Sequence, residues 1–220
     1  MIPLTDADRR PVIFPAMTLL LIIVNFIVFF IELAGGDPFV SRWSLVPSHI
    51  TARQDWITLL TSMFLHAGWE HILGNMVFLW AFGPEVEDAM GQLKYLGFYL
   101  LGGLIANFAQ IAIAPGSTVP SLGASGAIAA IMGAFVLAYP RDRIKTVLII
   151  GIFVRITFIP AILLIGLWFL LQVFSQLGAV ADVQNGGVAY MAHIGGFIYG
   201  AIAGRWFESP TTRENQETLG

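Results

Sequence analysis

The chain has 220 residues, of which 57% are hydrophobic and only 11% are charged, and its mean hydropathy is +0.78. In a soluble domain about a quarter of the residues are charged, so this composition excludes an ordinary soluble or disordered protein and predicts a chain surrounded by lipid. The net charge of −3 supplies no basic face for nucleic acid. The absence of cysteine excludes a disulfide scaffold, a thiolate nucleophile and cysteine-ligated metal.

Six segments are apolar enough to be considered as membrane-spanning helices, each of which needs about 20 residues. In chain order they cover approximately residues 12–34, 69–83, 93–114, 124–139, 158–177 and 187–207. The second and fourth are short, contain glycine and carry polar side chains. We therefore expect an all-α polytopic membrane protein with one six-helix domain at residues 12–207, between polar cytoplasmic tails at residues 1–11 and 208–220.

Two further stretches need an interpretation. Residues 146–154 are apolar but lie between basic residues, and we expect a loop or helix extension at the membrane interface rather than a seventh span. The long connection at residues 35–57 contains Trp43 and Trp56, which predicts that it lies against the membrane surface.

The distribution of Lys and Arg predicts the orientation, because cytoplasmic loops are enriched in these residues. In a six-helix topology, only Arg42 and Arg53 lie on one side, and Arg155 is ambiguous. The others lie on the opposite side: Arg9, Arg10, Lys94, Arg141, Arg143, Lys145, Arg205 and Arg213. We expect both termini in the cytoplasm of a multi-pass plasma-membrane protein, and the short tails without a presequence favour a prokaryotic cell.

A few polar residues interrupt the apolar segments, where ionisable groups are costly and are functional candidates by default. His71 and Asn75 are four residues apart, so both project from one face of the second helix. They could equally serve as interhelical hydrogen-bonding groups that hold the bundle together.

Small residues mark the fourth and sixth helices. Ser125 lies between Gly123 and Gly126 at the start of the fourth helix, and Ala127, Ala129 and Ala130 follow. His193 precedes a four-residue repeat of glycine in the sixth helix, at Gly196, Gly200 and Gly204. Such faces allow helices to approach closely without any catalytic role. If these two faces dock, Ser125 and His193 come within hydrogen-bonding distance.

That pair predicts acyl-transfer chemistry. A serine hydroxyl becomes a useful nucleophile when a neutral histidine accepts its proton. The developing oxyanion needs donors, which His71, Asn75 and the backbone N–H of Ser125 could supply. No Asp or Glu lies near Ser125 or His193 in the sequence, so we expect a Ser-His dyad. A soluble hydrolase with a nucleophile elbow would need a preceding buried strand, and none is evident.

The spacing of these residues resembles that of rhomboid intramembrane serine proteases over nearly the whole chain. The resemblance rests on His66-Ala-Gly-Trp-Glu-His71-Ile-Leu-Gly-Asn75, on Gly123-Ala-Ser125-Gly126, and on Ala192-His193 with Gly196 and Gly200. It implies that Ser125 is the nucleophile, that His193 is the general base and acid, and that His71 and Asn75 form the oxyanion site. His66 is expected to brace or hydrate the site, and Glu87 and Gly91 to be structural.

The resemblance also implies a substrate and a topology. The substrate would be a single-pass transmembrane protein, cleaved near the outer face of the bilayer without cofactor, metal or ATP. The fifth helix, rich in Leu and Phe, is a candidate gate for the substrate or a plain lipid-facing surface.

Two positions depart from the family pattern. Ile57 follows Trp56 where many rhomboids have Arg, and Ala129 stands where many have an aromatic residue that packs on the catalytic histidine. The orientation of His193 must then depend on other residues, for which Phe135, Tyr190 and Tyr199 are candidates.

Two other classes of function stay open. A catalytically silent rhomboid-like protein could bind membrane clients with the same fold, although such proteins typically lack the serine or the histidine. A small channel or transporter could use His71, Asn75 and His193 as a polar path.

Overall fold

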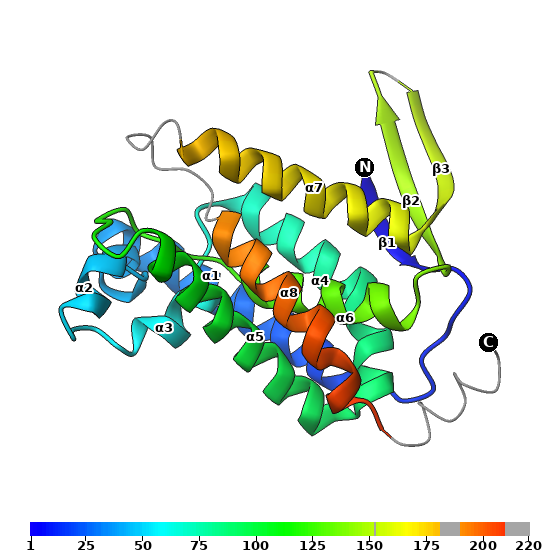
Figure 1. The fold of residues 1–220 in the computed structure, drawn as a ribbon, viewed down its shortest axis with the longest axis horizontal. Helices are drawn as coiled ribbons and strands as arrows, with labels where there is room; N and C mark the ends of the chain where they lie inside the picture. Colours follow the sequence, from blue (N-terminus) through cyan, green and yellow to red (C-terminus); the bar gives the residue numbers. More distant parts are fainter. Residues whose placement is uncertain (152, 181–189, 210–220) are drawn as a thin grey trace.

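The computed structural model describes residues 1–151, 153–180 and 190–209, most of which are helical. The long helices are α1 (Ala16–Trp43), α4 (Trp69–Met90), α5 (Gln92–Ile113), α6 (Ser125–Ala138), α7 (Ala161–Val180) and α8 (Tyr190–Phe207) (Figure 1). Between α1 and α4 lie α2 (Pro47–Thr51), α3 (Thr58–Thr61) and the 3-10 turn η1 (Ser62–Phe64). Three strands, β1 (Ile2–Asp6), β2 (Arg143–Ile150) and β3 (Phe153–Pro160), form a sheet at one end of the bundle.

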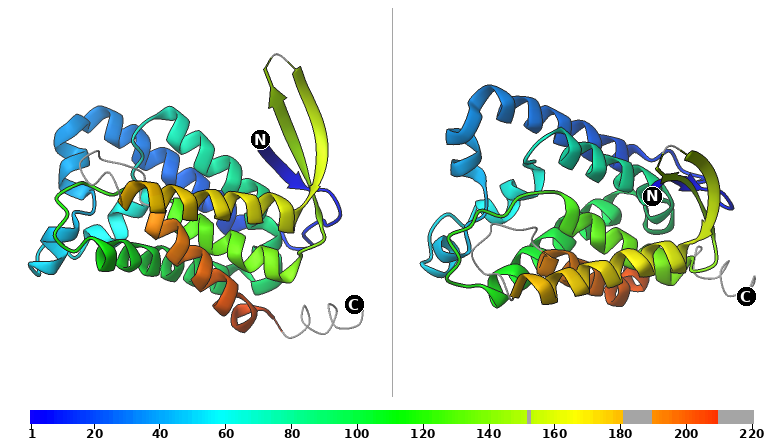
Figure 2. Two further views of the ribbon diagram at one scale, coloured as in Figure 1. Left: turned by 45° about the horizontal axis from the view of Figure 1, so that its top comes forward. Right: turned by 90° about the horizontal axis from the view of Figure 1, so that it is seen from above.

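Helix α6 lies at the centre of the bundle. Every residue from Gly126 to Val136 is buried, and the helix contacts α4, α5, α7 and α8. Seen from above, α1 and α4 lie on one side of it, and α7 and α8 on the other (Figure 2). A short helix of small and apolar residues therefore forms the core around which the longer helices pack.

Each of the six expected spans coincides with a helix, although the boundaries differ. By length and hydropathy α1 and α5 qualify as membrane spans, whereas α6 and Ala161–Gln176 of α7 are shorter apolar helices. The count of six spans therefore stays a prediction. Helix α1 continues past the expected end at residue 34 to Trp43, through a kink where Gly36 has a φ of 61°. Residues 187–189 of the sixth expected span lie outside the described residues.

The sheet corrects two expectations from the sequence. The fold is not all-α, and within residues 146–154 the described residues 146–150 and 153–154 belong to the antiparallel strands β2 and β3 rather than to a loop or a helix extension; residue 152 lies outside the described residues. Strand formers such as Thr146, Val147, Val154 and Ile156 fill these strands. The first eleven residues include β1, which pairs antiparallel with β2, so this expected tail is partly ordered into the sheet.

Polar contacts join the end of β1 to the start of β2. Asp8 accepts a hydrogen bond of 2.6 Å from Nη2 of Arg143, and this contact lowers the pKa of the Asp8 carboxyl. Arg9 pairs with Asp142. Burial, together with the nearby charge of Asp142, raises the pKa of Asp6 to about 6. The same end of the bundle therefore carries both ion pairs and a carboxyl that is costly to ionise.

Glu87 anchors the start of α1. Its carboxylate accepts hydrogen bonds from the backbone N–H of Met17 (2.9 Å) and of Thr18 (2.8 Å), and from Oγ1 of Thr18 (2.7 Å). These N–H groups lie in the first turn of α1, where no intrahelical acceptor exists. Gly91 ends α4 with a φ of 79°. Both residues thus have the structural roles that the resemblance implies.

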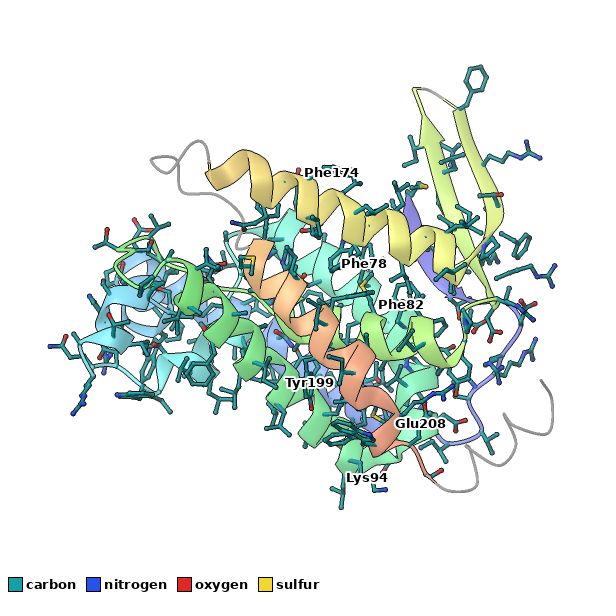
Figure 3. The ribbon with its side chains drawn as sticks, viewed as in Figure 1. Phe78, Phe82, Lys94, Phe174, Tyr199 and Glu208 are labelled. Atoms are coloured by element: carbon teal, nitrogen blue, oxygen red, sulfur yellow. The ribbon has the colours of Figure 1, made fainter. Side chains whose placement is uncertain are left out.

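Apolar side chains cover the outer surface of the bundle. On α7 they include Leu163, Leu167, Leu170, Leu171 and Phe174, all of which are exposed. Phe174 lies on the outer face of this helix, whereas Phe78 and Phe82 of α4 lie within the bundle (Figure 3). An apolar exterior of this kind is expected for a chain in contact with lipid.

Candidate active site

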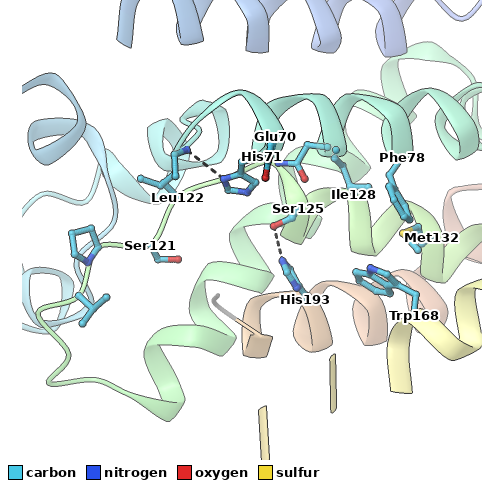
Figure 4. Close-up of a pocket in the computed structure, with 15 residues that line it drawn as sticks. Glu70, His71, Phe78, Ser121, Leu122, Ser125, Ile128, Met132, Trp168 and His193 are labelled. Atoms are coloured by element: carbon cyan, nitrogen blue, oxygen red, sulfur yellow. Dashed lines mark hydrogen bonds between the residues drawn. The ribbon is translucent and has the colours of Figure 1, made fainter. Parts of the chain in front are cut away.

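Ser125 and His193 point toward each other between α6 and α8 (Figure 4). The Oγ atom of Ser125 lies 2.6 Å from Nε2 of His193, although the residues are 68 positions apart in the sequence. Ser125 is the first residue of α6, and His193 lies in the first turn of α8 and is buried. The distance is that of a hydrogen bond between a hydroxyl and an imidazole nitrogen, which is the geometry that a nucleophile and its base require.

Glycine brings the two helices into backbone contact. A Cβ atom added at Gly196 would collide with the carbonyl oxygen of Gly126, and one added at Gly200 would collide with that of Ala130. From the opposite helix, a Cβ atom at Gly133 would collide with the carbonyl oxygen of Phe197. The prediction that small-residue faces of these helices dock is confirmed, and this contact sets the separation of Ser125 and His193.

His71 lies on the other side of Ser125, beside Gly123. The backbone N–H of Ala67 is 3.3 Å from Nδ1 of His71 and donates to it, so the ring carries its proton on Nε2. A Cβ atom at Gly123 would lie 2.9 Å from this Nε2 and 3.6 Å from Oγ of Ser125. Gly123 has a φ of 130°, which favours glycine. The imidazole N–H of His71 therefore faces the space beside the serine.

Two further donors belong to residues that line the same cavity, Asn75 and Ser125. Asn75 is buried one helical turn after His71, and its Nδ2 has no hydrogen-bond partner among the described residues. The backbone N–H of Ser125 lies at the N-terminus of α6, where helical N–H groups lack intrahelical acceptors. An unpaired buried amide is costly unless a ligand satisfies it, so the arrangement fits an anion formed during a reaction.

A cavity of about 610 Å³ opens at these residues. Its wall comes from α4, from the segment before α6, and from α6, α7 and α8; the lining residues are Ala67, Glu70, His71, Gly74, Asn75, Phe78, Val119, Pro120, Ser121, Leu122, Ser125, Ile128, Met132, Trp168 and His193. His193 and His71 lie beside Ser125, Glu70 and Ser121 are further polar residues of the wall, and the remainder is mostly apolar. A peptide segment with apolar side chains could enter such a space.

His66 is close to the site but does not line the cavity. Its backbone N–H donates to Oε2 of Glu32 at 3.0 Å, and its buried ring lies edge-on to that of His71 with the centroids 5.2 Å apart. This position suits a bracing role for the His71 ring.

Two residues that contact His193 were not predicted from the sequence, and both lie on α7. Oε1 of Gln172 lies 2.7 Å from Nδ1 of His193, and the ring of Trp168 packs beside the imidazole at a centroid distance of 5.8 Å. The candidates Phe135 and Tyr199 instead pack on other aromatic rings. Gln172 could have been found, because it is a polar residue inside an apolar segment, the criterion that singled out Asn75.

Among residues 1–151, 153–180 and 190–209, no group of three or more His, Asp or Glu side chains is placed to hold a metal ion.

Comparisons with known proteins agree with this arrangement. The sequence model of the Rhomboid domain matches residues 53–209. The chain is 32% identical to the rhomboid protease GluP of Bacillus subtilis over 193 residues, which are 86% of this chain and 34% of that protein. It is 29% identical over 151 residues to the human mitochondrial presenilin-associated rhomboid-like protein, covering 64% of this chain and 35% of that protein.

A third relative is the mitochondrial rhomboid protein 1 of Saccharomyces cerevisiae, which is 25% identical over 191 residues, or 80% of this chain and 50% of that protein. The chain thus spans about a third to a half of the length of these curated relatives. The residues matched by the Rhomboid domain, 53–209, include α4, α6 and α8, the helices that carry His71, Asn75, Ser125 and His193. The chain belongs to the rhomboid family of membrane proteins.

Proposed function

We propose that this chain is an intramembrane serine endopeptidase in which Ser125 is the nucleophile and His193 the general base and acid. The observation that carries the proposal is the 2.6 Å contact between Oγ of Ser125 and Nε2 of His193 in a cavity lined by the donors His71 and Asn75. Membership of the rhomboid family and the similarity to a relative named as a protease support it.

The proposed reaction uses these contacts. Nε2 of His193 accepts the hydroxyl proton while Oγ of Ser125 attacks the peptide carbonyl, and a tetrahedral intermediate forms. Its oxyanion receives hydrogen bonds from the Nε2–H of His71, the Nδ2–H of Asn75 and the N–H of Ser125. His193 then gives its proton to the leaving amine, and water, activated by the same imidazole, hydrolyses the acyl-enzyme.

The expected substrate is a single-pass transmembrane protein cleaved near the outer face of the bilayer. The arrangement of charges supports this orientation, because Arg42 and Arg53 lie near α2 and the sheet with Arg143 lies at the opposite end of the bundle. With six spans and both termini in the cytoplasm, Ser125 at the start of α6 is near the outer surface, where water can enter. A substrate helix has to unwind locally to expose its carbonyl groups, and α7 is the proposed gate.

A fluorophosphonate probe tests the proposal. It should label Ser125 in the wild-type protein, in detergent or in liposomes, and should not label Ser125→Ala or His193→Ala. Both variants should keep the wild-type thermal unfolding temperature, which separates loss of chemistry from loss of fold. Absence of labelling in both media would contradict the protease assignment and favour a client-binding protein. Solute flux that persists in Ser125→Ala would favour a channel or transporter.

A further inference from the structure

Gln172 is a polar residue on the mostly apolar helix α7, where the residues before it, from Leu167 to Leu171, are all aliphatic or aromatic. Placing a primary amide in an apolar environment is unfavourable unless the amide makes hydrogen bonds. Its Oε1 atom lies 2.7 Å from Nδ1 of His193, and the other ring nitrogen of that histidine lies 2.6 Å from Oγ of Ser125. The imidazole is therefore held at both nitrogens, by groups from two different helices.

We propose that Gln172 is a positioning residue that holds His193 in the tautomer able to accept the proton of Ser125. The inference rests on the proposed protease function and adds the residue that orients its base.

The chemical reason lies in the two neutral forms of imidazole. An amide oxygen only accepts hydrogen bonds, so a contact with Oε1 of Gln172 requires the proton of His193 to be on Nδ1. Nε2 then carries the lone pair, which faces the hydroxyl of Ser125. In the opposite tautomer Nε2–H would donate to Oγ of Ser125 and could not take its proton. The contact therefore selects the reactive form of the base.

Trp168 adds a second restraint from the same helix. It lies four residues before Gln172, so both side chains project from one face of α7. Its indole packs beside the imidazole with an interplanar angle of 39°. Gln172 thus holds one ring nitrogen by a hydrogen bond, and Trp168 limits the movement of the ring by contact. Among the described residues no carboxylate hydrogen-bonds to His193, so a neutral amide takes the position that an aspartate holds in a catalytic triad.

Because both restraints come from α7, the orientation of the base depends on how this helix is seated. A displacement of α7 away from α8 breaks the contact of Gln172 and that of Trp168 together. The reactive arrangement then exists only while α7 lies against the first turn of α8.

Two substitutions at one position test the proposal. Gln172→Leu keeps a similar volume but removes the acceptor, and we expect kcat to fall about tenfold, the effect of one lost hydrogen bond, with KM unchanged. Gln172→Glu keeps an acceptor and adds a charge that stabilises the protonated imidazole. It should restore most of kcat and move the acidic limb of the pH–rate profile to higher pH. Gln176→Leu, one turn further along α7, is the matched control and should behave as the wild type.

The rate of fluorophosphonate labelling should also be lowest in Gln172→Leu, mostly restored in Gln172→Glu, and like the wild type in Gln176→Leu. Wild-type kcat in Gln172→Leu, or a Glu variant as slow as the Leu variant, would overturn the proposal.

A second measurement does not depend on activity. The ¹⁵N chemical shifts of the histidine rings report the tautomer, and the His193 signals are assigned by their loss in His193→Gln. The wild type should show a protonated Nδ1, and Gln172→Leu a mixture of tautomers. If the wild type carries the proton on Nε2, the proposal fails even in an active enzyme. If the wild type shows Nδ1–H but is not labelled by the probe, the protease function fails and the positioning contact stands.

Discussion

Replacing Gly200 by Ala should separate the serine from its base without touching either residue. The new Cβ atom would overlap the carbonyl oxygen, carbonyl carbon and Cα of Ala130. All three are backbone atoms of a buried helix, so no side chain can rotate away. Restoring ordinary van der Waals contact requires the helices to move apart by about 1 Å or more. Such overpacking costs about 1–3 kcal/mol of stability.

The same change should also slow catalysis. The 2.6 Å contact between Ser125 and His193 spans the same helix pair, and a misplacement of about 1 Å can reduce a rate about 100-fold. We expect kcat for a transmembrane substrate in liposomes to fall by about that factor, while the protein still folds.

Gly97→Ala on α5 is the control, because a Cβ atom there would meet nothing within 4 Å. A Gly200→Ala variant with wild-type kcat and wild-type unfolding temperature would refute the argument that backbone contact between α6 and α8 sets the catalytic distance. If Gly200→Ala does not fold, Gly204→Ala can be tested in its place. A Cβ atom added at Gly204 would lie 2.8 Å from the Cβ of Ala134, so the helices would be displaced less.

Three other changes probe separate parts of the molecule. Asn75→Ala removes a donor to the oxyanion and should lower kcat about 100- to 1000-fold in the same cleavage assay, with little change in thermal unfolding. Glu87→Gln weakens three hydrogen bonds to the start of α1 and should destabilise the fold by about 2 kcal/mol, measured by thermal or denaturant unfolding. Because burial raises the pKa of Asp6 from its usual 3.8 to about 6, the folded state loses stability as the pH rises between these two values, and the full loss persists above pH 6. Asp6→Asn should therefore raise the unfolding temperature at pH 8 but not at pH 4, and an equal gain at both would contradict this.

The helical part of the fold could be predicted from hydropathy, because each long helix contains a mostly apolar stretch of the sequence. The sheet could not. Ile149, Val154 and Ile156 are strand formers as well as apolar residues, and a short apolar run with basic flanks fits a strand or an interfacial helix equally well. The pairing partner, β1, lies more than a hundred residues earlier in a stretch that reads as a polar tail.

At the candidate site, too, the sequence indicates individual residues but does not indicate which residues from distant segments are in contact. Ser125, His193, His71 and Asn75 stood out because each is a polar residue in or at the end of an apolar segment. The structure brings these four residues to one cavity. Gln172 meets the same criterion, but its partner is 21 residues away on another helix, and only the packing of α7 on α8 reveals that contact.

The neutral character of Gln172 also has a physical reason. A carboxylate beside His193 would stabilise the imidazolium formed during the reaction, but it would have to stay ionised in the membrane before the reaction begins. On insertion scales a charged residue costs about 2.5–3.5 kcal/mol at the centre of a membrane helix, which is an upper bound for a position near the water-accessible site, whereas a hydrogen-bonded amide avoids that cost. The amide orients the base without burying a permanent charge, and it gives up the electrostatic stabilisation that a triad provides. Gln172→Glu measures this exchange directly, because it should stabilise the protonated base and destabilise the folded protein in the membrane.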